Sequence, residues 1–246
     1  MNTLVDPSFK QIQFYLTASY PCSYLPDRKA RSQVASPSYK VDTQGYAYLM
    51  TLGFRRSGLF TYRPFCDNCQ SCIPIRIVTH EFESNRSQRR AKVKHQNLHA
   101  ELMRPAFQQA HYELFMRYQS ERHPDGAMNQ DSIEQYTQFL IKSQVDSYLI
   151  EFTDPADQSI KMVMLVDLVE NGLSAVYTFY EPEPRNSYGT YAVLWAIDFA
   201  KQRQLSYLYL GYWIKESQKM NYKNRFTPNE VYRGGAWKTY SEAKSE

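Results

Sequence analysis

The segment from residue 148 to residue 210 constrains the fold more than any other part of this chain. Alternating apolar residues predict three strands, over 148–153, 161–169 and 173–180. The Asn171–Gly172 pair before the third strand is a strong hairpin signal. A helix is expected over 190–203, followed by the last strand over 205–210. Because a crossover through a helix joins parallel strands, this last strand should lie beside the third.

This layout of a meander, a crossover helix and a parallel strand resembles the acetyltransferase-like (GNAT) fold, which makes the chain α+β. In that fold the two parallel strands splay apart, and the acyl donor lies in the gap. The resemblance implies that six residues line the gap: Ser174, Tyr177, Tyr180, Tyr209, Gly211 and Tyr212. Users of coenzyme A hold its pyrophosphate on a glycine-rich loop at the helix start. Here the corresponding loop, RNSYGTYA, has a single glycine, Gly189, and does not suit coenzyme A. Coenzyme A-dependent N-acetylation is therefore the alternative interpretation and not the leading one.

The rest of the chain predicts a smaller cysteine-containing, basic amino-terminal domain over 1–104, ahead of the GNAT-like domain over 105–246. Residues 11–17 alternate like a half-buried strand. Helices are expected over 105–123 and after Asp131, which can form a capping box with Glu134. The helix from Pro105 could belong to either domain.

Three arginines of the amino-terminal half are candidates for binding an anion. Gly53 and Gly58 bracket Arg55 and Arg56, which predicts a tight turn that presents both guanidinium groups. The isoleucines of the strand expected over 73–77 alternate, which places Arg76 on the opposite face.

Two stretches gather basic residues as polyanion-binding surfaces do, and the second also contains aromatic residues. The first carries Arg86, Arg89, Arg90, Lys92 and Lys94, several of which would align on one side of a helix. The second carries Lys219, Tyr222, Lys223 and Arg225. A net charge of +4 is only mildly basic, but 21 Tyr and 13 Phe in 246 residues fit a protein that binds something large. A solvated basic face is the alternative for both stretches.

Four cysteines define a possible metal site. Cys66, Cys69 and Cys72 are spaced C-x-x-C-x-x-C, and Cys22 is a possible fourth ligand. An iron–sulfur cluster, zinc, or reduced structural thiols all remain open. The five histidines show no ligand spacing and are expected to be structural. With no secretory leader and no apolar run of about 18 residues, we expect a cytoplasmic protein without a membrane partner.

Ordered motifs over almost the whole chain resemble the aminoacyl-tRNA–protein transferase family, whose best-known members are arginyltransferases. In the amino half these are CSYLPDRKAR, FRRSG with YRPFC, CIPIRI and RSQRRAKVKHQNL. In the carboxyl half they are ERHPDGAM, VDL, LSAVYTFYEP, YGTYAVLWAI, YLYLGYWI and KMNYKNRFTPNE. The family transfers an amino acid from a charged tRNA to the α-amino group of a protein and so marks it for degradation. The short length and the cysteine run look like the bacterial branch.

That branch implies transfer of leucine from leucyl-tRNA to proteins that begin with Asp or Glu, with arginyl-tRNA as the alternative donor. Since an aminoacyl ester is already activated, the enzyme mainly has to align an amine and help remove its proton, and no cofactor is required. A non-catalytic RNA-binding module with a cysteine-bound metal is the alternative from another class.

The resemblance also implies roles for individual residues. Asp167 is expected to be the base or the carboxylate that orients the amine, although a carboxylate satisfied at a sheet edge is the alternative. Tyr177 and Tyr180 would place the terminal adenosine or the amine, or else belong to the core. The Lys219–Arg225 block would contact the tRNA acceptor end, and the basic residues of 86–94 its outer phosphates. Arg55, Arg56 or Arg76 would bind the acidic first residue of the acceptor.

Overall fold

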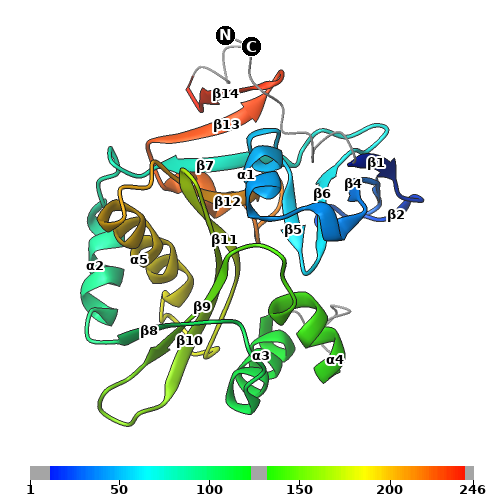
Figure 1. Ribbon diagram of the computed structural model, residues 1–246. Coiled ribbons are helices and arrows are strands. Elements are labelled where there is room, and N and C mark those ends of the chain that lie inside the picture. Colours follow the sequence, from blue (N-terminus) through cyan, green and yellow to red (C-terminus); the bar gives the residue numbers. More distant parts are fainter. Residues whose placement is uncertain (1–11, 123–131, 242–246) are drawn as a thin grey trace.

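The computed structural model describes residues 12–122 and 132–241, which form two main β-sheets flanked by helices (Figure 1). The larger sheet has eight strands in the order β14-β13-β7-β12-β11-β10-β9-β8. The smaller has four, in the order β1-β4-β6-β5, and β2 and β3 form a separate pair.

The centre of the large sheet is the predicted meander and crossover. β9 (Ser147–Thr153), β10 (Ile160–Val169) and β11 (Gly172–Tyr180) are antiparallel neighbours, and β10 and β11 meet at the predicted Asn171–Gly172 hairpin. Helix α5 (Tyr188–Gln202) then leads to β12 (Tyr207–Trp213), which pairs in parallel with β11. The expected strand order and direction are therefore confirmed.

The outer strands of the large sheet come from both ends of the chain. The prediction that 205–210 is the last strand is wrong, because β13 (Asn229–Arg233) and β14 (Ala236–Thr239) follow it. β7 (Ile73–Val78), the predicted isoleucine strand, pairs with both β12 and β13, and β8 (His99–Met103) pairs with β9. The expected division at residue 105 does not follow the sheets, since β7 and β8 lie in the large one.

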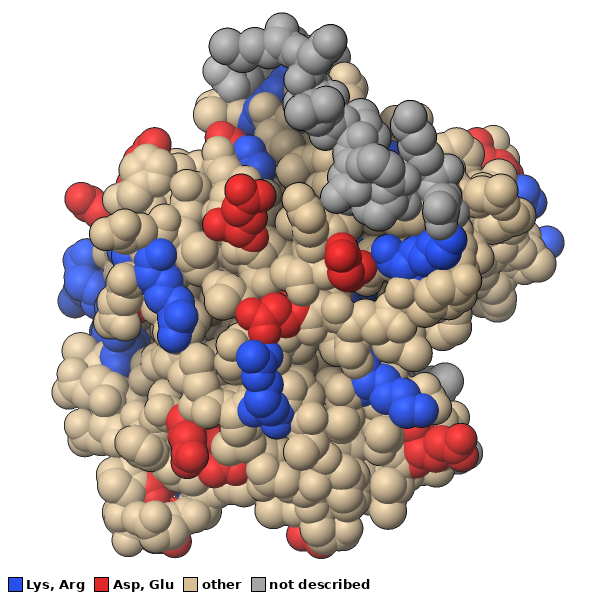
Figure 2. Space-filling model, in the orientation of Figure 1, with Lys and Arg blue, Asp and Glu red and all other residues tan. Residues whose placement is uncertain are grey.

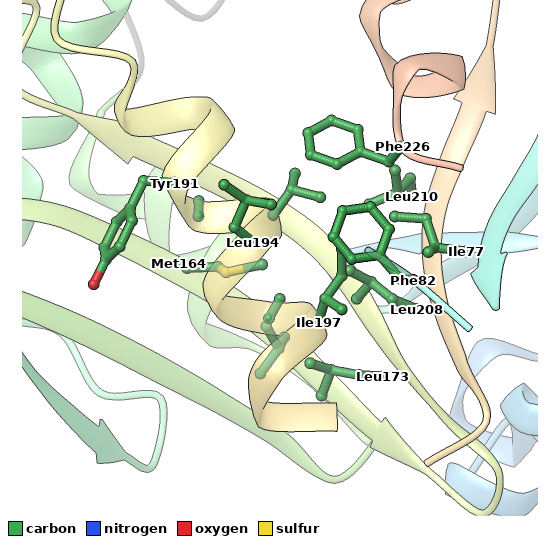
Figure 3. Packing of buried hydrophobic residues seen from close by; sticks show 14 of the residues in the cluster. Ile77, Phe82, Met164, Leu173, Tyr191, Leu194, Ile197, Leu208, Leu210 and Phe226 are labelled. Atoms are coloured by element: carbon green, nitrogen blue, oxygen red, sulfur yellow. The ribbon is translucent and has the colours of Figure 1, made fainter. Parts of the chain in front are cut away.

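Helices cover both faces of the large sheet. α5 and the basic helix α2 (Arg86–His95) lie on one face, where Ala192, Ala196 and Ala200 of α5 are buried against the strands. Small residues four positions apart let a helix approach a sheet closely. Figure 3 shows Leu194 and Ile197 of this helix pointing toward Leu208 and Leu210 of β12.

The opposite face is covered by α3 (Gln109–Arg122), α4 (Ile133–Tyr136) and the π-helical turn η4 (Thr137–Ile141), which bury Phe115 and Leu140. The helix expected from residue 105 begins only at Gln109. The cap of α4 is Ser132, which forms a capping box with Gln135 in place of the predicted Asp131 pair. Asp131 lies outside the described residues. Among the described helices, none combines the length and apolarity needed to cross a bilayer.

The small sheet consists of β1 (Gln13–Leu16), β4 (Ser32–Ser36), β6 (Phe60–Pro64) and β5 (Arg55–Ser57). β2 (Tyr20–Pro21), β3 (Lys29–Ala30), η2 (Ser38–Lys40), α1 (Thr43–Thr51) and η5 (Asn221–Arg225) complete the described elements. The strand predicted near the amino terminus is present as β1. All four of its side chains are exposed, whereas the alternation predicted a half-buried strand; β1 lies at the edge of this sheet.

A buried ion pair joins the two sheets. Arg56 of β5 donates through Nε and Nη2 to both carboxylate oxygens of Asp167 on β10, at 2.7 and 2.5 Å. Ser147 of β9 donates to the same carboxylate at 2.7 Å, and Arg56 Nη1 donates to the carbonyl of Gly58 at 3.0 Å. Both charged side chains are almost fully buried. The fork of an arginine on a carboxylate fixes both position and orientation, so this pair sets how β5 meets the large sheet.

We expect Asp167→Asn to reduce the free energy of unfolding by roughly 3–5 kcal/mol, because it leaves the Arg56 guanidinium buried without a counter-charge. Asp146→Asn is the matched control, since Asp146 pairs with the exposed Arg104 at 2.5 Å and should cost no more than about 1 kcal/mol. Urea unfolding followed by fluorescence measures both. Equal losses would contradict a structural role for the buried pair.

Candidate active site

The predicted gap between the two parallel strands is present. β11 and β12 pair from Gly172–Tyr207 to Ser174–Tyr209 and then separate. Just beyond this point the register of β11 against β10 shifts and leaves Val176 as an extra residue. The register of β12 against β7 shifts after Tyr209 as well. A bulge bends its strand and ends regular pairing, so the two bulges account for the splay.

The side chain of Arg55 enters this gap from β5. Its Nη2 donates to the carbonyl of Val176, the bulged residue, at 2.9 Å. On the other side, a Cβ atom added to Gly211 would lie 2.6 Å from Nη1. Gly211 also has φ +75°, a conformation that side chains with a Cβ rarely adopt. The two bulges therefore shape a slot for one guanidinium group, and the glycine in β12 is part of it.

The surroundings of Arg55 are tyrosines rather than carboxylates. The guanidinium carbon lies 5.9 Å from the ring centre of Tyr212. Burial raises the pKa of Tyr24 to about 12, and the charge of Arg55 opposes that shift. Within the described parts of the chain, no aspartate or glutamate forms an ion pair with Arg55. A half-buried cation without a counter-charge is a site that an incoming anion can satisfy.

A second basic group lies in the same region. Lys223 of η5 is buried, and its Nζ donates to the carbonyl of Tyr212 at 2.9 Å. Burial holds the pKa of Lys223 well below its ordinary value, and the charge of Arg55 lowers it further. The sequence placed Lys223 on a surface that meets tRNA, but its side chain points into the protein.

One cavity is lined by Arg55, and a second is lined by tyrosines that neighbour it. The first, of about 20 Å³, room for about one water molecule, is lined by Arg55, Ser174 and Gly211. The second, a much larger groove of about 1120 Å³, lies along the small sheet and the cysteines. Tyr212 lines both cavities.

Arg55 and Arg56 do not share the tight turn that the sequence predicted. Both lie on strand β5, where successive side chains point to opposite faces. Arg55 therefore enters the gap, whereas Arg56 is held by Asp167, Ser147 and Gly58. The contacts of Arg56 leave its guanidinium no free fork for an acceptor carboxylate, and the Asp167 carboxylate is fully buried with both oxygens hydrogen-bonded.

Arg76, the third arginine candidate, is also engaged. Its Nε and Nη2 contact Glu230 at 2.7 and 2.6 Å, and Nη1 donates to the Tyr209 hydroxyl at 3.1 Å. Its guanidinium carbon lies 3.5 Å from the ring centre of Tyr207 and 4.4 Å from that of Trp237. Of the three arginines, only Arg55 lacks a carboxylate partner among the described residues.

Of the two tyrosines expected in the site, Tyr177 lies on the face covered by α3, whereas Tyr180 contacts both α3 and α5. Tyr177 accepts a hydrogen bond from Gln119 at 2.9 Å, and its ring centre is 5.1 Å from that of Phe139. The ring of Tyr180 packs 4.8 Å from Tyr118 and 5.9 Å from Tyr188. Both are partly buried in aromatic clusters, and their roles toward a substrate stay predictions.

The basic helix predicted over part of 86–104 is α2, whose charges lie toward the left edge of the face in Figure 2. Part of this charge has partners: Lys92 pairs with Asp198, Lys94 donates to the carbonyl of Arg185, and Arg89 donates to that of Ser84. Arg86 and Arg90 are exposed.

In the second basic stretch Lys219, Tyr222 and Arg225 are exposed while Lys223 is buried. The structure therefore leaves most of the residues predicted to bind tRNA on the surface, and their role stays a prediction.

The four cysteines line the large groove together. All four are free thiols. The pKa of Cys72 is raised to about 12, mainly by burial and also by the neighbouring Cys22, Cys66 and Cys69. Within the described chain, no three His, Cys, Asp or Glu side chains are arranged to hold one metal ion. Metal binding by the four thiols stays a prediction.

Four further residues, not predicted from the sequence, build the site. Tyr24 and Tyr62 surround Arg55, Ser147 completes the Asp167 contacts, and Glu230 neutralises Arg76. Tyr24 lies within the motif CSYLPDRKAR, and Tyr62 is the first residue of YRPFC, so these motifs could have pointed to both. Ser147 and Glu230 carry no local signal, because only the folded sheet brings them to their partners.

Solved structures of other proteins share part of this architecture. One is L-PGS from Bacillus licheniformis, at a TM-score of 0.45 and 9% identity over 59% of this chain and 48% of that chain. FemX matches at a TM-score of 0.43 and 11% identity over 66% of this chain and 58% of that chain.

Similarity in sequence is much stronger. The chain is 50% identical to the aspartate/glutamate leucyltransferase of Thiobacillus denitrificans over 94% of this chain and 96% of the relative. The protein of that name from Nitrosospira multiformis is 49% identical over 96% and 94%. Residues 20–90 match the family "Arginine-tRNA-protein transferase, N terminus", and residues 110–233 match its C-terminus counterpart. The chain therefore belongs to the arginine-tRNA-protein transferase family, in the branch of the bacterial aspartate/glutamate leucyltransferases.

Proposed function

We propose that this protein transfers leucine from leucyl-tRNA to the α-amino group of proteins that begin with Asp or Glu, and so marks them for degradation. Support comes from relatives of about 50% identity, named aspartate/glutamate leucyltransferases, that match almost the whole chain. The structural observation that carries the proposal is Arg55, a cation without a carboxylate partner in the described residues, held in the gap between β11 and β12.

The reaction converts an ester into an amide. The acceptor nitrogen attacks the carbonyl carbon of the leucyl ester, the bond from that carbon to the tRNA oxygen breaks, and a proton passes from the nitrogen to the departing oxygen. Because the ester is activated, alignment is the main task of the enzyme. The eight-stranded sheet with its splayed parallel pair supports a GNAT-like core in which both substrates meet at the gap.

Arg55 is the arginine that we propose for binding the acidic first residue of the acceptor. Arg56 and Arg76 are neutralised by Asp167 and Glu230, whereas the guanidinium of Arg55 touches a backbone carbonyl and tyrosine rings. An Asp or Glu side chain would supply the missing negative charge through charge-assisted hydrogen bonds. For Asp167 we propose a positioning role through Arg56, in place of the proton-accepting role expected from the sequence.

The donor would approach over η5, which contacts β12 and exposes Tyr222 and Arg225, with Lys219 exposed just before it. The chemistry needs no cofactor, and no step depends on a metal. Whether the four cysteines bind an iron–sulfur cluster or zinc stays a prediction that metal analysis of anaerobically purified protein would decide. A cytoplasmic location, where charged tRNAs occur, also stays a prediction.

Leucine transfer is tested with purified protein, labelled leucyl-tRNA or arginyl-tRNA, and peptides that begin with Asp, Glu, Lys or Ala. We expect label to move from leucyl-tRNA to the Asp and Glu peptides only. Transfer from arginyl-tRNA would keep the family chemistry but contradict the donor. Absence of transfer from both, together with binding of acetyl-coenzyme A, would favour the N-acetyltransferase.

We expect Arg55→Ala to lower kcat/KM for Asp- and Glu-initiated peptides at least about thirtyfold, because removing one partner of a buried charge pair costs roughly 2 kcal/mol or more. Binding of leucyl-tRNA should change little. Arg55→Lys keeps the charge without the planar fork and should retain part of the activity. An equal loss of tRNA binding and peptide use in Arg55→Ala would show that Arg55 does not read the acceptor.

A further inference from the structure

The large groove beside the cysteines has no role in the reaction described so far. Its volume of about 1120 Å³ exceeds the roughly 300–1,000 Å³ of small-molecule pockets, which favours a segment of a polymer as its occupant. We propose that this groove binds the residues that follow the first residue of the acceptor protein, and that it prefers acidic side chains there. This inference rests on the proposed function.

The charge of the groove supports an acidic occupant. Arg28 and Lys29 line it with exposed side chains, and Arg31 lines it half-buried. None of the described residues that line the groove is an aspartate or glutamate. Asp67 neutralises part of this positive charge, since its carboxylate lies 3.4 Å from Arg31 Nη2. The buried Nε of Arg31 has no hydrogen-bond partner. A wall with one sign of charge attracts segments of the opposite sign and rejects like charge.

Exposed rings give the groove apolar contact area. Tyr20, Phe60 and Phe65 line it and are 40%, 63% and 48% exposed. Neighbouring large exposed aromatic side chains are uncommon on a protein surface unless they meet a partner. Aromatic residues together with arginine are enriched where proteins recognise one another.

The inner end of the groove leads to the proposed acceptor site. Tyr24, Tyr62 and Tyr212 line the groove, and these three are among the four tyrosines that interact electrostatically with Arg55. A polypeptide whose first side chain reaches Arg55 would therefore place its following residues along the groove. Extended backbone advances about 3.3 Å per residue, so a few residues span a groove of this size.

Single-stranded RNA is the competing occupant, because bases stack on rings and phosphates attract cations. The position of Arg55 beside three of the tyrosines that line the groove favours the polypeptide, since only the acceptor needs a fixed cation for its first side chain. The two occupants predict different losses when the groove is altered.

The test compares peptides that share Asp at position 1 and carry Glu, Gln or Lys at positions 2–5. We expect kcat/KM for leucine transfer to fall roughly tenfold from the Glu to the Lys peptide. In the double variant Arg28→Ala/Lys29→Ala this preference should shrink at least roughly twofold, and at most disappear, because two exposed charges are lost. Phe60→Ala should raise KM for every peptide. KM for leucyl-tRNA should stay unchanged in each variant.

Arg203→Ala and Tyr39→Ala are the matched controls, because both remove an exposed side chain that does not line the groove. Neither should change the peptide preference. Fluorescence anisotropy with labelled peptides and no tRNA measures binding separately from transfer. If the protein transfers no leucine, the proposed function fails, yet binding of the Glu peptide and its loss in the double variant still test the groove.

Two results would overturn the inference. One is leucine transfer, or peptide binding, that is indifferent to charge at positions 2–5 and to the groove variants. The other is a raised KM for leucyl-tRNA with peptide KM unchanged, which would assign the groove to RNA.

Discussion

The ion pair between Arg56 and Asp167 is the contact on which the proposed site depends. It fixes β5 of the small sheet against β10 of the large sheet, with both carboxylate oxygens engaged and both side chains almost fully buried. Because side chains alternate along a strand, holding Arg56 on one face of β5 directs Arg55 to the other, into the gap. A buried pair is weak evidence for net stability, since desolvation offsets the attraction. Its effect here is geometric: it determines where the neighbouring guanidinium lies.

The gap receives that guanidinium because two strands are irregular at the same level. The bulge at Val176 turns a carbonyl toward Arg55, and Gly211 leaves room where a Cβ atom would lie 2.6 Å from Nη1. Neither strand could pair regularly here and still admit the side chain. The splay, the glycine and the arginine thus form one arrangement, in which a cation is held by a carbonyl and tyrosines and still lacks a negative partner among the described residues.

Sequence reasoning succeeded where local signals decide the structure. Period-two alternation, the Asn171–Gly172 turn and the crossover helix predicted β9 to β12 and their order. It did not predict that β7 and β8 join this sheet, because those pairings are long-range and have no turn signal. It also could not separate Arg55 from Arg56 and Arg76. Which arginine keeps an unpaired charge depends on Asp167 and Glu230, more than a hundred residues away in sequence.

The same long-range contacts separate the two sides of the gap. η5 and α2, with the basic residues that the sequence assigned to tRNA, adjoin β12 and α5, whereas the groove is built from the small sheet, the cysteine loops and Tyr212. Tyr212 belongs to both sides: its ring faces the groove and Arg55, and its carbonyl accepts from Lys223. Strand β12 therefore carries both the Tyr212 ring, which lines the groove, and the Tyr212 carbonyl, which holds Lys223 of η5. A two-substrate transfer requires such a division, because an ester and an amine must reach one point without competing for one surface.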